Sequence, residues 1–158
     1  MASIYEEIKK DHDTHRALME RLGETTGDSE ERRAAWTRFY HEIKSHSAAE
    51  EETFYSKLIS KTWGQDAARH SVHEHAQIDD LLDELNEMDM SSGGWLTKFK
   101  TLRDEYEHHM EEEENEVFAR AKKVIGAEQD EEFGERFRKR KVEERGLVEE
   151  KQKDKLED

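Results

Sequence analysis

Apolar residues recur at intervals of three and four along four stretches of the chain, which is the periodicity of amphipathic helices. The stretches span residues 3–22, 29–62, 66–88 and 95–125, and short glycine-containing breaks separate them. Four helices joined by short connections pack up, down, up, down. The pattern therefore predicts an all-α, up-down-up-down four-helix bundle over residues 1–126.

In two of the predicted helices, a histidine and a glutamate four residues later replace apolar residues on the apolar face, and we call each such pair an interruption of the apolar stripe. When His46 is laid on His109, residues 39–58 align with residues 102–121, and Glu50 falls on Glu113. Side chains four residues apart stack on one face of a helix, so each pair can direct an imidazole and a carboxylate at one point. A buried carboxylate without a partner is unfavourable, and a bound dication is the simplest compensation.

The other two helices also place histidine near their apolar faces. His12 and His15 share the stripe of the first helix; we favour His12 as a metal ligand and retain His15 as a further candidate. His75 and His70 lie on the two shoulders of the third helix, where His75 is favoured and His70 is the alternative. At 1.5 Å rise per residue, one histidine from each helix lies roughly 16 to 27 Å from the same end of the bundle. The four imidazoles can therefore meet at one depth.

Two more residues near the second interruption are candidates for the site. Glu114 adjoins Glu113 and is a further candidate ligand, while Tyr106 precedes His109 by one turn on the same face. The tyrosine is a candidate for the outer shell of a metal rather than a direct ligand. We find no candidate catalytic residue separate from the metal ligands.

Composition narrows the choice of chemistry. The chain has no cysteine, so any metal is held by nitrogen and oxygen, and 42% of its residues are charged. A net charge of −15 argues against a nucleic-acid partner for the main body. No apolar run approaches the roughly 18 residues of a membrane span, and the N-terminus has no apolar signal region. We expect a cytoplasmic protein without a membrane partner, and the sequence leaves its oligomeric state open.

Residues 127–158 differ in composition from the rest and form the second predicted unit. They are almost entirely charged, with too few apolar residues for a core helix of their own. We expect a helical C-terminal tail in which Phe133 and Phe137 dock on the bundle. This tail is also the candidate surface for a protein partner.

The favoured ligand set contains four imidazoles and two carboxylates. Carboxylates that bridge two ions, with histidines in terminal positions, suit a pair of iron or manganese ions better than a closed tetrahedral zinc site. Six protein ligands cannot fill two six-coordinate ions, which leaves positions for water, oxygen or peroxide. The set is His12, His46, Glu50, His75, His109 and Glu113.

These residues resemble the motifs of the hemerythrin-like, or HHE cation-binding, family over about residues 3–125. The resemblance implies a four-helix bundle with two non-haem iron ions and an oxo or hydroxo bridge, in which manganese or zinc can substitute. Oxygen-carrying hemerythrins have HxxxH on the third helix, whereas Gln77 stands four residues after His73 here. The chain is therefore similar to the H-HxxxE-H-HxxxE subgroup. The motifs are Asp11-His12, His46-xxx-Glu50-Glu51, Glu74-His75 and His109-xxx-Glu113-Glu114.

The resemblance also implies a class of reaction. We expect a di-iron protein that reacts with peroxide, oxygen or nitric oxide, and we favour catalase-like removal of peroxide. A ligand sphere rich in carboxylate stabilises oxidised ions, which disfavours reversible oxygen carriage. One alternative is a non-enzymatic sensor of oxygen, nitric oxide or iron whose tail signals to a partner. The other is a metal-free acidic helical interaction protein.

Overall fold

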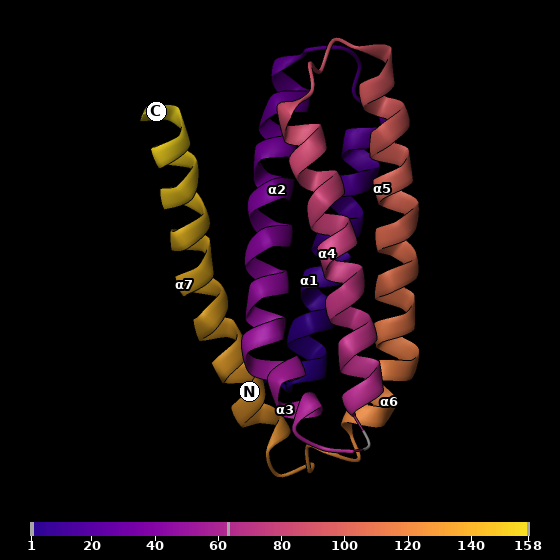
Figure 1. The fold of residues 1–158 in the computed structure, drawn as a ribbon, viewed down its shortest axis with the longest axis vertical. Helices are drawn as coiled ribbons and strands as arrows, with labels where there is room; N and C mark the ends of the chain where they lie inside the picture. Colours follow the sequence, from indigo (N-terminus) through magenta and orange to yellow (C-terminus); the bar gives the residue numbers. More distant parts are fainter. Residues whose placement is uncertain (1, 63, 158) are drawn as a thin grey trace.

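Four long helical segments stand side by side, with loops at both ends (Figure 1). The structure is a computed structural model that describes residues 2–62 and 64–157, with side chains as far as Lys151. Within these residues there is no strand, and no helix is long and apolar enough to cross a bilayer. The predicted helical bundle is confirmed. Its helices are α1 (Ile4–Gly23), α2 (Glu30–Glu50) continued by α3 (Ser56–Ile59), α4 (Gln65–Glu87), and α5 (Gly93–Glu112) continued by α6 (Phe118–Ala121).

Buried side chains divide the interior into two apolar clusters with a polar layer between them. One cluster lies near the α1–α2 and α4–α5 loops, and it contains Trp36, Phe39, Trp95 and Phe99. The other lies at the α3 and α6 end and contains Ile4, Phe54, Leu58 and Phe118. The histidine and glutamate interruptions of the stripes fall between these clusters, so the polar side chains are buried at mid-height in the bundle.

A π-helical turn follows each of the two interruptions. The turn η1 (Glu51–Tyr55) separates α2 from α3, and η2 (Glu113–Val117) separates α5 from α6. A π turn adds one residue to the helical turn, and such turns occur frequently at functional sites. The periodicity predicted uninterrupted helices here, so these turns are a difference between the sequence-based expectation and the structure.

The predicted tail is a single long helix, α7 (Asp130–Glu157), that packs along α2 and α1. Figure 1 shows it beside α2, diverging from the bundle toward its C-terminal end. Phe133 and Phe137 are buried in the second apolar cluster, which confirms the expected docking. The helix reaches the polar layer as well, because the Phe137 ring lies 5.4 Å from the ring of His46.

Gly134 allows α7 to approach the start of the chain closely. A Cβ atom at this position would lie 2.5 Å from the Ala2 carbonyl oxygen. We expect Gly134→Ala to destabilise the fold by about 1–2 kcal/mol, because the backbone must shift and overpacking outweighs the better helix propensity of alanine. Chemical denaturation measures the change.

The matched control is Gly146→Ala on the same helix, where a Cβ atom meets nothing within 4 Å. This substitution is expected to stabilise the protein by about 0.5–1 kcal/mol through propensity alone. Equal effects of the two substitutions would show that α7 does not dock through Gly134.

Charged residues also hold α7 against the bundle. The Lys141 ammonium lies 2.8 Å from one oxygen of Asp11 and 3.0 Å from one oxygen of Glu42, and Arg145 pairs with Glu42 as well. Burial acts to raise the pKa of Glu42, but the neighbouring imidazole of His15 and the ammonium of Lys141 outweigh it and lower the pKa to about 2. Glu42 is therefore ionised in the folded protein at pH values where it is protonated in the unfolded chain.

This depressed pKa predicts a pH-dependent contribution to stability. Because the folded-state pKa is lower than the unfolded one, the contribution is complete above about pH 4.5 and is lost as the pH falls toward 2. At neutral pH, Glu42→Gln should cost about 2 kcal/mol, and this difference from the wild type should shrink between pH 5 and pH 3. Urea denaturation across that range measures it, with exposed Glu105→Gln as the control. A difference independent of pH would contradict this account.

Candidate metal centre

Six buried side chains converge in the polar layer and form two overlapping groups of four. In each group, one ligand atom per residue lies within 4.8 Å of the others. Glu50 and Glu113 belong to both groups, which places the two carboxylates between two positions for a cation. His12 and His46 complete the first group, and His75 and His109 complete the second. The six residues are those that the sequence favoured as ligands, and they come from all four helical segments of the bundle.

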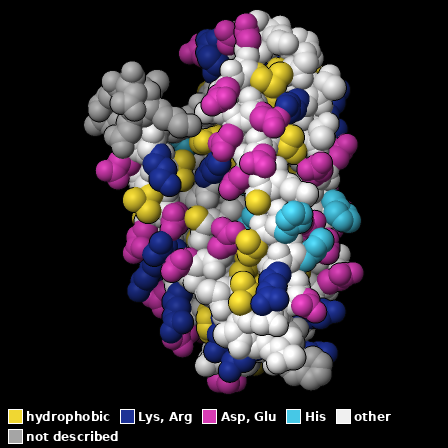
Figure 2. All heavy atoms as spheres, in the orientation of Figure 1, with side chains coloured by type: hydrophobic (Ala, Val, Ile, Leu, Met, Phe, Trp, Pro, Cys, Tyr) yellow, Lys and Arg dark blue, Asp and Glu magenta, His cyan; other side chains and the backbone are white. Residues whose placement is uncertain are grey.

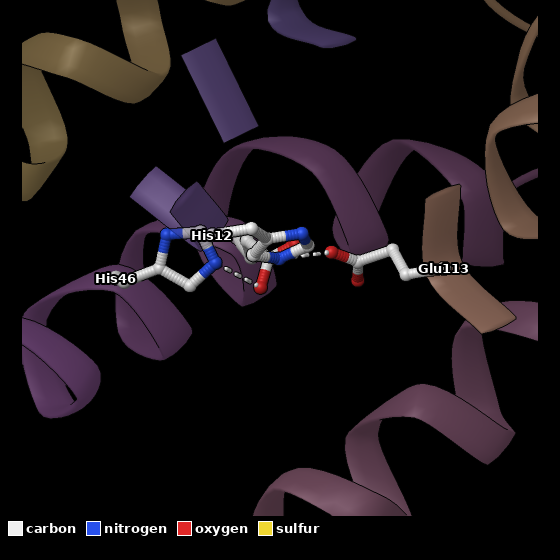
Figure 3. Close-up of side chains that lie close together, drawn as sticks. His12, His46 and Glu113 are labelled. Atoms are coloured by element: carbon white, nitrogen blue, oxygen red, sulfur yellow. Dashed lines mark ion pairs between the residues drawn. The ribbon is translucent and has the colours of Figure 1, made fainter. Parts of the chain in front are cut away.

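Four polar atoms at the middle of this layer are buried without a hydrogen-bond partner among the described residues. They are Nε2 of His12, Nε2 of His46 and one carboxylate oxygen each of Glu50 and Glu113. His12 Nε2 lies 3.1 Å from Glu113 Oε1, and His46 Nε2 lies 2.8 Å from Glu50 Oε1, but neither pair has the geometry of a hydrogen bond. Figure 3 shows the His12 imidazole lying between His46 and the carboxylate of Glu113. Atoms of this kind, buried and converging, fit a bound cation.

The outward nitrogens of the imidazoles are held by a second set of carboxylates. Such contacts fix the orientation of a metal-binding imidazole and raise its basicity. For three of the histidines the Nδ1-to-oxygen distance is that of a hydrogen bond, and for His75 it is longer, 3.8 Å to Glu51. The three are His12 with Glu114 at 2.9 Å, His46 with Asp11 at 2.7 Å, and His109 with Glu74 at 2.9 Å.

The carboxylates of the layer shift the pKa values of neighbouring groups. Burial acts to lower the pKa of His46, but the Glu50 and Asp11 carboxylates outweigh it and raise the pKa to about 9. Burial is likewise outweighed at His75, where Glu50 raises the pKa to about 9. Burial and the neighbouring Glu50 raise the pKa of Glu113 well above its usual range. A dication binds the deprotonated forms of these groups, so metal affinity should rise with pH.

Tyr55 is part of the layer, although the sequence analysis did not single it out. Its hydroxyl donates to Glu113, and it lies 3.4 Å from Glu50 Oε2. In a regular α-helix a residue five positions after Glu50 points well away from it, but η1 widens the turn and brings Tyr55 round to the same side. The available signal was the pair of adjacent apolar residues, Phe54 and Tyr55, that widens the stripe after the interruption.

The other candidate residues lie outside both groups of four. His15 is buried, with Nδ1 2.9 Å from the Tyr106 hydroxyl and Nε2 3.5 Å from Glu42. Tyr106 touches the centre through its ring, which stacks on His109 at 6.0 Å, rather than through its hydroxyl. Glu114 contacts the outward nitrogen of His12, and the His70 side chain is 53% exposed on the surface of the bundle. The structure therefore places His75, not His70, at the centre.

Comparisons with known proteins show the family of the chain. The model of the hemerythrin HHE cation binding domain matches residues 3–121. A crystal structure of a hemerythrin HHE cation binding domain-containing protein from Mycobacterium kansasii superposes with a TM-score of 0.85 at 27% identity, covering 96% of this chain and 92% of that one. A protein from Nostoc sp. (strain PCC 7120) named DNA nickase is 23% identical over 145 residues. That match covers 90% of this chain but only 41% of the Nostoc protein. The chain belongs to the hemerythrin HHE cation-binding domain family.

Proposed function

We propose that the chain binds two non-haem iron ions in the polar layer and that the loaded centre reacts with peroxide, with oxygen and nitric oxide as the other candidate ligands. The observation that carries the proposal is the presence of Glu50 and Glu113 in both groups of four. Two carboxylates shared between two imidazole pairs match a pair of ions bridged by carboxylate. A single tetrahedral ion would use only one of the two groups.

The residues of the layer have separate roles in this proposal. His12 and His46 would hold one ion, His75 and His109 the other, and the two glutamates would bridge them. Iron supplies Lewis-acid and redox chemistry at positions that the protein leaves open. The Tyr55 hydroxyl, which donates to Glu113, keeps that carboxylate oriented. The apolar clusters above and below the layer exclude bulk water from it.

Removal of peroxide is the reaction that we favour. The site offers two anionic carboxylates and four imidazoles, which favours the oxidised state of iron over reversible binding of oxygen. We expect iron-loaded protein to contain about two irons per chain, to absorb in the near ultraviolet, and to release oxygen from hydrogen peroxide. Metal analysis, absorption spectra and an oxygen electrode measure the three quantities.

The zinc-loaded protein serves as the control for the redox chemistry of the metal. Zinc has no redox chemistry, so zinc-loaded protein should be folded and inactive. Iron-loaded protein that leaves peroxide unconsumed would rule out the catalase-like reaction while leaving the metal centre in place. Failure to bind iron after anaerobic reconstitution would instead favour the metal-free interaction protein.

A second candidate function is a sensor in which α7 responds to the metal. Lys141 on α7 contacts Asp11, and Asp11 holds the outward nitrogen of His46. A change at His46 can therefore reach α7 through Asp11 and Lys141, and also through the Phe137 ring beside His46. Under this proposal, hydrogen exchange of the amides of α7 differs between metal-loaded and metal-free protein, and the difference is smaller in Lys141→Met. Identical exchange in both forms would remove the support for a sensor.

A further inference from the structure

Two further histidine–glutamate pairs with i, i+4 spacing lie on the outside of the bundle. His70 and Glu74 are on α4, and His108 and Glu112 are on α5. This is the spacing that the interior pairs His46–Glu50 and His109–Glu113 use. Of these four residues the centre uses only Glu74, which supports His109, and the two pairs face each other across neighbouring helices.

The four outer side chains form a continuous line of contacts. His70 Nε2 lies 3.1 Å from Glu112 Oε1 and 3.6 Å from Glu74 Oε2, and His108 Nε2 lies 3.5 Å from Glu112 Oε2. Ligand atoms of His70, Glu74 and Glu112 all lie within 4.8 Å of one another. Each carboxylate thus contacts two imidazoles, since Glu74 also contacts His109.

The line runs from solvent to the interior centre. The His108 side chain is 73% exposed and that of His70 is 53% exposed, whereas those of Glu74 and Glu112 are 15% and 23% exposed. Figure 2 shows exposed histidine side chains gathered over α4 and α5 among acidic ones. Glu74 has one oxygen toward His70 and the other 2.9 Å from His109 Nδ1. Glu74 therefore contacts the exposed imidazole of His70 on one side and the buried imidazole of His109 on the other.

We propose that His70, Glu74 and Glu112 form a surface site for a first-row divalent cation, distinct from the two interior groups of four, with His108 beside it against Glu112. One imidazole and two carboxylates from two helices give one nitrogen and two oxygen donors, a set suited to zinc or manganese with water completing the coordination. A net charge of −15 raises the local concentration of cations around the protein. A cation bound at this site neutralises part of the negative charge of Glu74 and so weakens the interaction of Glu74 with His109 Nδ1.

Zinc titration of the full chain with its interior centre already loaded tests the proposal. Calorimetry at pH 7.5 should detect one additional Zn²⁺ per chain. His70→Ala is expected to weaken this binding about tenfold or more, since even supporting groups of a metal contribute about 10–100-fold. Glu112→Gln should act in the same direction, because it removes the carboxylate that contacts both outer imidazoles.

His73→Ala is the matched control, because His73 is exposed on the same helix, where its ring nitrogen lies 3.4 Å from Gln77 Nε2. It should leave the additional Zn²⁺ in place. The same affinity in His70→Ala and His73→Ala would overturn the proposal, as would the absence of an additional Zn²⁺ in the wild type. The comparison does not depend on the interior centre, since both histidines lie outside its two groups of four. A chain that binds no interior iron would still show the difference between the two variants.

Discussion

The double variant Glu50→Ala/Glu113→Ala is expected to bind no metal ion at the centre and to lose the stabilisation that metal gives the wild type. Both groups of four contain both residues, so the variant keeps only two imidazoles for each position. At a free metal concentration of 100 times Kd, the wild type should gain about 2.7 kcal/mol per site. Thermal unfolding with and without a chelator, together with metal analysis, measures the loss.

The double variant Glu52→Ala/Glu111→Ala is the control, because both residues are exposed on the same helical segments. It should bind metal and respond to the chelator as the wild type does. Metal-free protein offers a second comparison. In the metal-free state, the cavities left by the two alanines lower the free energy of unfolding of the Glu50→Ala/Glu113→Ala variant. The removal of two neighbouring buried carboxylates offsets part of this loss. Retention of two ions per chain in this variant would refute the proposed ligand set.

Asp11→Asn is expected to weaken metal binding at the first group by about 10–100-fold, although Asp11 is not one of the six proposed ligands. Its carboxylate lies 2.7 Å from His46 Nδ1 and 2.8 Å from the Lys141 ammonium. The neutral amide loses the charge that raises the basicity of His46 and fixes its ring. The variant also leaves Lys141 with one carboxylate partner instead of two.

Competition with a chromophoric chelator measures the affinity of the Asp11→Asn variant. Asp13→Asn is the matched control, since Asp13 lies on the same helix and its side chain is 60% exposed and paired with Lys9. An affinity within twofold of the wild type in both variants would show that Asp11 supports only the docking of α7.

The periodicity of the sequence predicted the bundle and the placement of the six converging residues because both depend on local spacing. His46 and Glu50 stand on a stripe of apolar residues, and the structure buries them between two apolar clusters. Gaps of four residues needed only a regular helix to bring each pair together. Whether His75 or His70 faces the interior depends on how α4 is rotated about its axis against its neighbours. Only the structure shows this rotation.

Other parts of the site could not be predicted because they depend on departures from a regular helix or on distant contacts. The position of Tyr55 follows from η1, and a π turn has no clear signature in a single sequence. The link between Lys141 and Asp11 joins residues 130 positions apart. The carboxylates that hold the outward nitrogens stand in the quoted motifs, but they lie off the apolar stripes, so spacing alone did not show which imidazole each one contacts.

The repeated motif gives the two halves of the bundle an approximate sequence symmetry, in which Glu50 corresponds to Glu113. At the positions matched to Tyr55 and Phe118, this symmetry is broken, because only the first has a hydroxyl, and its ring lies 5.3 Å from His75. On the opposite side, the only ring that α7 brings within contact of the described imidazoles is that of Phe137, beside His46. Two ions in this frame would have matching protein ligands but unequal surroundings. We therefore expect them to accept electrons at two distinct reduction potentials.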